Sequence, residues 1–145
     1  MSASAPSGHR PRQILLVDNE KSVVEAYREA LEDHFPYDRV ETAANGFDAV
    51  EAFRLRRHDV MVMDIHMPVM DGQQAEYEIR MFCEEKNIPE PDIIFFTGYL
   101  PPDSMKETIR MNPACSLLLK PVTAKTLIEE IEKKLTARAE TEADA

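Results

Sequence analysis

"VMVMDIHMPVMDG", from Val60 to Gly72, is the stretch that decides the fold of this chain. Four apolar residues lead to Asp64, and a turn-forming sequence that ends in Asp71-Gly72 follows directly. A short apolar run without polar alternation is typical of a strand that is covered on both faces of a parallel sheet. Taken alone, Asp64 could simply cap the next turn. Its place at the end of a buried strand suggests instead a chemical purpose.

The composition limits the class of protein. A chain of 145 residues, 43% of them hydrophobic, is enough for one packed domain. The net charge of −10 at pH 7 opposes binding to nucleic acid, so we expect no nucleic-acid partner. No apolar run reaches about 18 residues and the N-terminus lacks a secretory signal, which predicts a cytoplasmic protein without a membrane partner. Cys83 and Cys115, without a CxxC motif, are interpreted as reduced thiols.

Short apolar runs alternate along the chain with segments of helical periodicity. The helical segments repeat their apolar residues every three or four positions, as Val24, Tyr27 and Leu31 do. The five runs that we interpret as strands are 13–17, 39–43, 59–63, 92–96 and 116–120. Five strands that alternate with five helices are typical of an α/β fold, a doubly wound parallel sheet with helices on both faces.

The two ends of the chain differ in composition from the segment between them. Residues 1–12 are rich in Ser, Ala, Pro and Gly, which predicts a flexible N-terminal tail. Residues 137–145 contain mainly Ala and acidic residues, which predicts an acidic C-terminal tail. We therefore expect a single domain over residues 13–136.

Four of the five predicted strands end in a polar or charged side chain. These side chains are Asp18, Asp64, Thr97 and Lys120. The carboxyl ends of parallel strands meet at one edge of the sheet, where ligands bind. Two neighbouring carboxylates need a cation between them, and Mg²⁺ is usually held by one or two carboxylates. A carboxylate can also accept a phosphoryl group, whose oxygens Lys120 and Thr97 would then bind.

The sequence around these side chains resembles the receiver domain of two-component response regulators. The matching stretches are "ILLVDNE", "VMVMDIHMPVMDG", "IIFFTGY" and "LLLKP", in the order and at the intervals of that family. The resemblance covers about residues 13 to 135. It implies a flavodoxin-like, receiver-type fold with the strands in the order 2-1-3-4-5.

The resemblance also implies a role for each matching residue. Asp64 is similar to the phosphoacceptor, which receives its phosphoryl group from a sensor histidine kinase or a histidine phosphotransfer protein. Thr97 resembles the hydroxyl that responds to phosphorylation, and Lys120 resembles the lysine that pairs with the phosphoryl group. The bond from Lys120 to Pro121 is expected to be cis. The Mg²⁺ ligands that the resemblance implies are Asp18, Asn19, Asp64 and the backbone carbonyl of His66.

Asn19 departs from the family pattern. The family usually carries two acids after the first strand, and the second of them is Asn19 in this chain. An amide oxygen can bind Mg²⁺ but brings no charge. We therefore expect weaker Mg²⁺ binding, with Asp18 or Glu20 partly substituting.

A second departure concerns the switch. The aromatic residue that the family usually has on the fifth strand corresponds to Leu117, which leaves the coupling of Thr97 to an aromatic ring open. Tyr99 lies at a position where the family varies and where the lifetime of the phosphoryl group is tuned. Together with His66 it could shield the phosphoaspartate from water.

Three functions stay open at this point. The first, which we favour, is a receiver that catalyses only its own phosphorylation and dephosphorylation. The helix that ends before Asn112, the strand at 116–120 and the helix after Thr123 would then form a face for a partner or a homodimer. The second is a degenerate receiver that binds proteins without phosphorylation, because Asn19 weakens Mg²⁺ binding. The third, an aspartyl-phosphate phosphohydrolase, is disfavoured since such enzymes carry the nucleophile after the first strand.

Other side chains have structural interpretations. Met61 and Met63 are expected to fill the core. His34 and His58 are expected at the surface. Asn19 could cap the first helix in addition to binding a metal.

Overall fold

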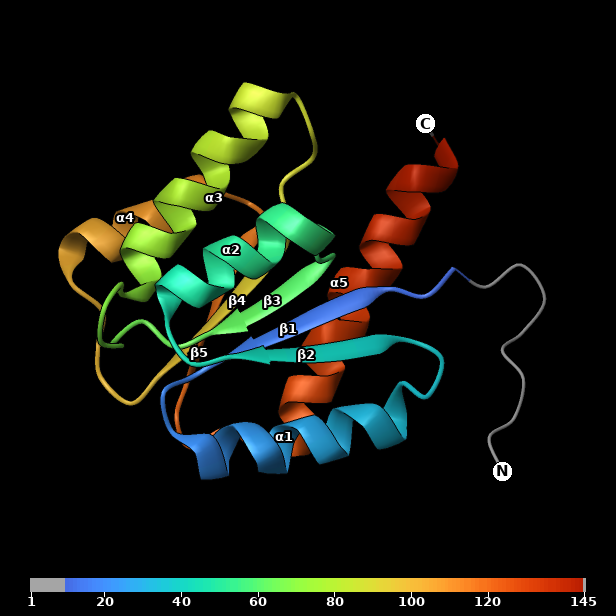
Figure 1. Cartoon of the computed structure of the whole chain (residues 1–145), viewed down its shortest axis with the longest axis horizontal. Coiled ribbons are helices and arrows are strands. Elements are labelled where there is room, and N and C mark those ends of the chain that lie inside the picture. Colours follow the sequence, from blue (N-terminus) through green and yellow to red (C-terminus); the bar gives the residue numbers. More distant parts are fainter. Residues whose placement is uncertain (1–9, 145) are drawn as a thin grey trace.

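Strands and helices alternate along the chain in the computed structural model, which describes residues 10–144 (Figure 1). In order, the elements are β1 (Gln13–Val17), α1 (Lys21–His34), β2 (Arg39–Ala43), α2 (Gly46–Arg56), β3 (Val60–Met63), α3 (Gly72–Lys86), β4 (Asp92–Thr97), α4 (Asp103–Met111), β5 (Cys115–Leu119) and α5 (Ala124–Asp144). All five strands form one parallel sheet in the order β2-β1-β3-β4-β5. The predicted fold, a doubly wound five-stranded sheet with five helices, is confirmed.

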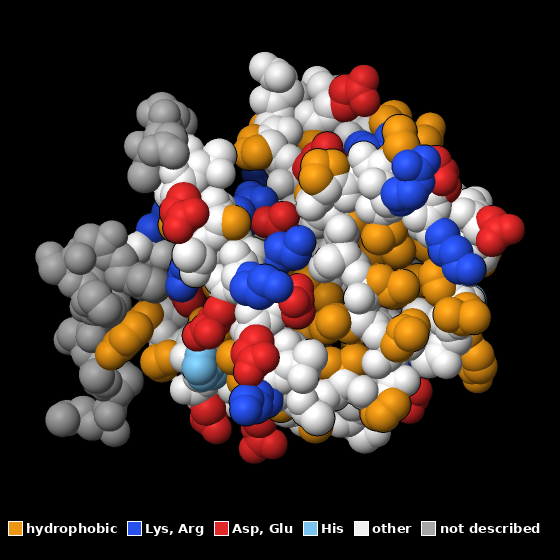
Figure 2. Space-filling model, turned by 180° about the vertical axis from the view of Figure 1, so that it is seen from behind, with side chains coloured by type: hydrophobic (Ala, Val, Ile, Leu, Met, Phe, Trp, Pro, Cys, Tyr) orange, Lys and Arg blue, Asp and Glu red, His pale blue; other side chains and the backbone are white. Residues whose placement is uncertain are grey.

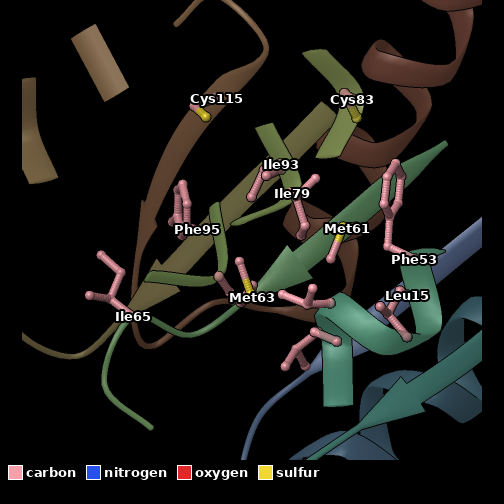
Figure 3. Packing of buried hydrophobic residues seen from close by; sticks show 14 of the residues in the cluster. Leu15, Phe53, Met61, Met63, Ile65, Ile79, Cys83, Ile93, Phe95 and Cys115 are labelled. Atoms are coloured by element: carbon pink, nitrogen blue, oxygen red, sulfur yellow. The ribbon is translucent and has the colours of Figure 1, made fainter. Parts of the chain in front are cut away.

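Helices cover both faces of the sheet and produce two separate hydrophobic clusters. Because neighbouring strand residues point to opposite faces, Leu15 of β1 enters the cluster under α2, α3 and α4, whereas Ile14 enters the cluster under α1 and α5. Figure 3 shows the first cluster, with Phe53 of α2 lying over Met61 of β3. Met61 and Met63 are fully buried, as predicted. Burial from both sides explains why the strand sequences are apolar throughout.

Side chains at the helix starts fix where α2, α3 and α5 begin. Asn45 accepts the N–H of residue 48 at 2.8 Å, and Asp71 accepts the N–H of residue 74 at 2.8 Å. Thr123 accepts the N–H of residue 126 at 3.1 Å before α5. The start of α1 is different, because Glu20 occupies the cap position and makes no side-chain bond there. The interpretation of Asn19 as a cap is therefore wrong.

Several boundaries lie one residue away from the sequence prediction. The third strand begins at Val60, the fourth includes Thr97, and the fifth ends at Leu119, so that Lys120 follows the strand. Strand ends depend on ladder hydrogen bonds, which an apolar pattern does not show. At the C-terminus, residues 137–144 form the last turns of α5. Residues 1–9 of the predicted N-terminal tail lie outside the described residues. Within residues 10–144, no helix is long and apolar enough to cross a membrane.

The expectation for His58 is wrong, whereas His34 is exposed as predicted. His58 lies just before β3 and only 1% of its surface is accessible. Arg57 ends α2 in the left-handed region, with a φ of 49°, and the chain then enters the sheet. The Nε2 of His58 lies 2.8 Å from Oε1 of Glu41 on β2, so the imidazole has a polar partner inside the protein.

Candidate functional site

Two aspartates lie side by side at the carboxyl edge of the sheet. Asp18 follows β1 and Asp64 follows β3, and these neighbouring strands place Val17 opposite Met63. The N–H of Asp64 donates to the carbonyl of Val17 at 3.0 Å. Both aspartates are buried, with 2% of Asp18 and 7% of Asp64 accessible. The sheet therefore fixes two carboxylates next to each other with little contact with solvent.

The ammonium group of Lys120 joins these two carboxylates. Its Nζ lies 3.1 Å from Oδ2 of Asp18 and 3.1 Å from Oδ2 of Asp64. Burial by itself lowers the pKa of Lys120, but the hydrogen bonds and charges of the two aspartates outweigh burial and raise the pKa above its ordinary value. Lys120 is therefore charged at neutral pH and brings one positive charge to two negative ones.

The other oxygen of each carboxylate bonds to the backbone. Oδ1 of Asp18 accepts the N–H of Glu20 at 2.9 Å, and Oδ1 of Asp64 accepts the N–H of His66 at 3.2 Å. Each bond closes a local turn between a residue and the second residue after it. These turns orient both side chains so that their Oδ2 atoms face the same point, which Lys120 occupies.

Thr97 reaches the same edge from β4. The N–H of Lys120 donates to the carbonyl of Thr97 at 2.8 Å, and the bond from Lys120 to Pro121 is cis, as expected. Thr97 is fully buried. Its Oγ1 accepts the N–H of Tyr99 at 3.4 Å, which is long for a hydrogen bond. The four strand-end residues that the sequence singled out thus lie at one edge of the sheet, where the side chains of Asp18, Asp64 and Lys120 are in contact and Thr97 is joined to Lys120 through the backbone.

Asn19 and His66 lie beside this group and are exposed. Asn19 directly follows Asp18 in the loop before α1. The ring of His66 packs edge to face on the ring of Tyr99, with the centroids 5.7 Å apart and an interplanar angle of 82°. This contact joins the loop after β3 to the loop after β4.

Gly72 allows the first turn of α3 to approach Asp64 closely. A Cβ atom at Gly72 would lie 2.6 Å from the carbonyl oxygen of Asp64. The N–H of Gly72 also donates to the carbonyl of Ile65 at 2.8 Å. Because backbone atoms cannot move aside as a flexible side chain can, only glycine fits this position without a shift of the loop that carries Asp64.

Two aromatic residues of the site were missed by the sequence analysis. The Nζ of Lys120 lies 4.7 Å from the centroid of the Phe96 ring. Tyr27 of α1 packs edge to face on Phe96, and its hydroxyl donates to the carbonyl of Val122. Both residues follow the apolar pattern of their own element, which predicts that they face the protein interior but not that they support Lys120; Phe96 is buried and Tyr27 is partly buried.

The donor atoms at this edge suit Mg²⁺ in kind but are few. Carboxylate, amide and backbone carbonyl oxygens are the ligands that Mg²⁺ accepts. Asp18 and Asp64 already converge on one cationic group, the ammonium of Lys120. Among the described residues, no group of three or more His, Cys, Asp or Glu could hold a metal ion. The charged ligands of Mg²⁺ would therefore be the carboxylates of Asp18 and Asp64. Asn19 and the backbone carbonyl of His66 would be neutral ligands.

Residues 14–132 match the model of the response regulator receiver domain. The chain belongs to this family. The receiver is similar to the chemotaxis protein CheY of Halobacterium salinarum, with 32% identity over 126 residues that cover 87% of this chain and 98% of that protein. Among solved structures, it is similar to the chemotaxis protein CheY4 of Vibrio cholerae, with 28% identity, a TM-score of 0.70 and coverage of 86% of this chain and 98% of that one.

Other relatives carry a similar receiver within a much longer protein. Probable histidine kinase 1 of Oryza sativa subsp. indica is 32% identical over 98 residues, which are 64% of this chain and 10% of that protein. Sensor protein GacS of Pseudomonas syringae pv. syringae is 27% identical over 128 residues, which are 88% of this chain and 14% of that protein. Receivers are thus related to histidine kinases, and the family generally binds Mg²⁺ at an acidic pocket.

Proposed function

We propose that this receiver accepts a phosphoryl group on Asp64 and changes a protein-binding face in response. The observation that carries the proposal is the ammonium of Lys120, which lies 3.1 Å from both Asp18 and Asp64. One cation shared by two carboxylates leaves a net charge of −1 at a buried edge of the sheet. Such an arrangement can take up both a divalent cation and the oxygens of a phosphoryl group.

The phosphoryl group would come from a phosphohistidine of a sensor histidine kinase or a histidine phosphotransfer protein in the cytoplasm. An Oδ atom of Asp64 attacks the phosphorus, the P–O bond forms and the P–N bond breaks. The electron pair of the broken bond stays on the imidazole nitrogen, which takes up a proton. Lys120 offsets the charge of the phosphoryl oxygens. The domain catalyses this transfer and the later hydrolysis of its own acyl phosphate.

Mg²⁺ would be held by Asp18, Asn19, Asp64 and the backbone carbonyl of His66. When bound, it supplies positive charge to the phosphoryl oxygens. Asp18 and Asp64 are the two charged ligands, and the amide of Asn19 adds none. We therefore expect binding that is weaker than at a site with three acids.

Thr97 would connect phosphorylation to the binding face. Its Oγ1 makes only a long bond to the N–H of Tyr99, at 3.4 Å, so the hydroxyl can turn to a phosphoryl oxygen at little cost. The responding face consists of α4, β5 and α5, and in α4 only Met105 is buried. Figure 2 shows hydrophobic side chains gathered on the side of the molecule where α4 and β5 lie. A partner protein or a second copy of the chain would bind there.

The rings of His66 and Tyr99 would limit the access of water to the phosphoaspartate. They contact each other at 5.7 Å between centroids and lie on the loops that follow Asp64 and Thr97. Decay of the phosphorylated mass after removal of the donor measures this effect, and His66→Ala should shorten the half-life.

Incubation with acetyl phosphate and Mg²⁺, followed by mass spectrometry, tests the central step. The wild-type chain should gain the mass of one phosphoryl group, and Asp64→Asn should not. Asp71→Asn is the matched control, because it changes an aspartate of the same loop whose capping role asparagine can also fill. Equal labelling of the wild type and Asp64→Asn would show that the assignment is wrong.

A degenerate receiver is the second candidate, and Asn19 and Leu117 are the observations that favour it. Such a protein would bind its partners without phosphorylation. Amide NMR shifts near Asp18 and Asp64 during a Mg²⁺ titration distinguish the two functions. Binding at millimolar concentration or tighter would exclude the degenerate function, and the absence of binding and of labelling would support it.

A further inference from the structure

The ammonium group of Lys120 lies against an aromatic ring as well as between two carboxylates. Its Nζ is 4.7 Å from the centroid of the Phe96 ring, and Phe96 is 1% accessible. Two other cation–ring contacts among the described residues are longer, at 5.6 and 5.7 Å, and both involve arginines that are more exposed than Lys120. Attraction between a cation and a ring face increases as water is excluded. The contact at Lys120 is therefore the closest and the best shielded of the three.

Tyr27 of α1 contacts both the ring and the backbone beside Lys120. Its ring packs edge to face on Phe96, with the centroids 5.9 Å apart and an interplanar angle of 75°. Its hydroxyl donates to the carbonyl of Val122, two residues after Lys120. Tyr27 itself is partly buried against the hydrophobic cluster that contains Phe96. The Phe96 ring is therefore held in orientation by a neighbour from another element of the fold.

The two ion pairs of Lys120 use oxygens that the proposed reaction also needs. Nζ lies 3.1 Å from Oδ2 of Asp18 and of Asp64, and an oxygen of Asp64 would form the bond to phosphorus. The stem of a lysine is flexible, so a change in these partners alone would leave the ammonium group free to turn. The Phe96 ring attracts a cation through its quadrupole and takes no part in the bond changes. Its contact with Lys120 therefore does not depend on the state of Asp64.

We propose that Phe96 is a positioning residue for phosphoryl transfer, whose ring, supported by Tyr27, holds the ammonium group of Lys120 beside Asp64. This inference rests on the proposed function of Asp64. The side chain of Lys120 is 23% accessible, so it can turn toward solvent when the ring no longer attracts it. A residue that only filled the core at this position would leave the direction of Lys120 unchanged.

Replacement of Phe96 by pentafluorophenylalanine in the full chain separates positioning from packing. Fluorination reverses the charge on the ring face and changes the shape of the ring only slightly, so the core stays filled. We expect labelling by acetyl phosphate and Mg²⁺ to slow about tenfold, with the urea midpoint of unfolding nearly unchanged. The same replacement at Phe95 is the control and should keep the wild-type rate. Phe95 is fully buried in the cluster on the opposite face of the sheet (Figure 3).

A second measurement follows Lys120 itself, without metal or phosphodonor. In NMR spectra of the chain with ¹³C-labelled lysine, the ring of Phe96 should shift the ε-CH₂ protons of Lys120 upfield of those of exposed lysines. Lys120→Met assigns the resonance. Fluorination at Phe96 should move it toward the exposed lysines, and Tyr27→Leu should move it in the same direction because the ring loses its support. Fluorination at Phe95 should leave it in place.

Three results would overturn the inference. A chain fluorinated at Phe96 that is labelled at the wild-type rate, or whose Lys120 resonance does not move, would show that the ring does not hold the ammonium group. Equal slowing by fluorination at Phe95 would show that core packing is the cause. In these cases the wild type is still labelled and the proposed function of Asp64 stands. A wild type that acetyl phosphate does not label would overturn that function, and the inference with it.

Discussion

Aspartates with largely covered side chains lie at both edges of the sheet, Asp18 and Asp64 at the carboxyl edge, and Asp59 and Asp92 at the amino edge. Their side chains are similarly covered, with 1% and 10% accessible at the carboxyl edge and 10% and 15% at the amino edge. Burial therefore does not distinguish the two pairs. The cations beside them do.

At the amino edge the carboxylates are well supplied with donors. Asp59 accepts the backbone N–H of Gln13 at 2.9 Å and pairs with the guanidinium of Arg10 at 3.4 Å. Arg138 of α5 lies 3.2 Å from Asp92 and 3.8 Å from Asp59. Two guanidinium groups thus serve two carboxylates, and the cluster ties α5 and the segment before β1 to the sheet.

At the carboxyl edge the ammonium of Lys120 serves both carboxylates, and among the described residues no other cation forms an ion pair with either of them. The comparison teaches that the supply of cations, rather than burial, separates the pair of aspartates that we propose to be reactive from the pair that ties elements together. Removing Lys120 from the carboxyl edge should therefore lower activity, whereas removing Arg138 from the amino edge should lower stability.

Lys120→Met should produce the largest effect. Without the ammonium group, the charge on the phosphoryl oxygens loses its protein partner, and we expect the rate of labelling by acetyl phosphate to fall about 100-fold or more. Mass spectrometry over time gives the rate. Lys125→Met on α5 is the control and should keep the wild-type rate; a Lys120→Met rate within threefold of wild type would contradict the proposed role.

Arg138→Met should come next and should act on stability alone. The change leaves Asp92 without its cation and Asp59 with only Arg10, which should lower the free energy of unfolding by about 2 kcal/mol. Urea unfolding followed by circular dichroism measures the loss. Lys133→Met, on the same helix but 75% accessible, should change stability by less than about 0.5 kcal/mol. If the Arg138→Met variant is also labelled more slowly at Asp64, the two edges do not act independently.

Asn19→Asp should strengthen the binding of Mg²⁺ at the carboxyl edge. A third carboxylate next to Asp18 adds charge to the ligand set, and we expect the dissociation constant for Mg²⁺ to fall about tenfold. Isothermal titration calorimetry measures it without any phosphorylation. Asn45→Asp adds the same charge on the loop after β2 and should leave the constant nearly unchanged. Equal affinities of the wild type and Asn19→Asp would show that Asn19 does not face the metal.

The smallest expected effect comes from His58, which lies at the amino edge just before β3. This residue should make the stability of the protein depend on pH. Burial lowers the pKa of His58, and the hydrogen bond to Glu41 offsets only part of this shift. The unfolded chain therefore takes up a proton at a higher pH than the folded chain does. The stability that neutral His58 contributes is therefore fully present above the pKa of histidine in the unfolded chain, about 6.5. It is lost as the pH falls from there toward the pKa of His58 in the folded chain.

Urea unfolding at about pH 7.5 and pH 5.5 checks this sign. The wild type should lose more stability on acidification than His58→Gln does. If His58→Gln and the wild type show the same difference between the two pH values, burial of a neutral imidazole is not the cause.

The sequence allowed the prediction of the sheet and of its polar carboxyl edge for one physical reason. A strand buried on both faces is apolar throughout, so a polar residue such as Asp64 or Thr97 at its end stands out. The amino edge gave no such signal. Arg138 meets Asp92 across 46 positions of sequence, and such a pair depends on how α5 lies on the sheet rather than on any local pattern. His58 was misplaced for a similar reason, since its burial depends on Glu41 of another strand.

Helix α5 passes from one edge of the sheet to the other. It begins at Ala124, just after Lys120, and reaches Arg138 about 21 Å further along its axis. Leu127, Ile131 and Leu135 pack it on the sheet, and Arg138 pins it at the amino edge. A single helix is thus tied to both pairs of aspartates, at its start through the chain connection to Lys120 and near its far end through the guanidinium of Arg138.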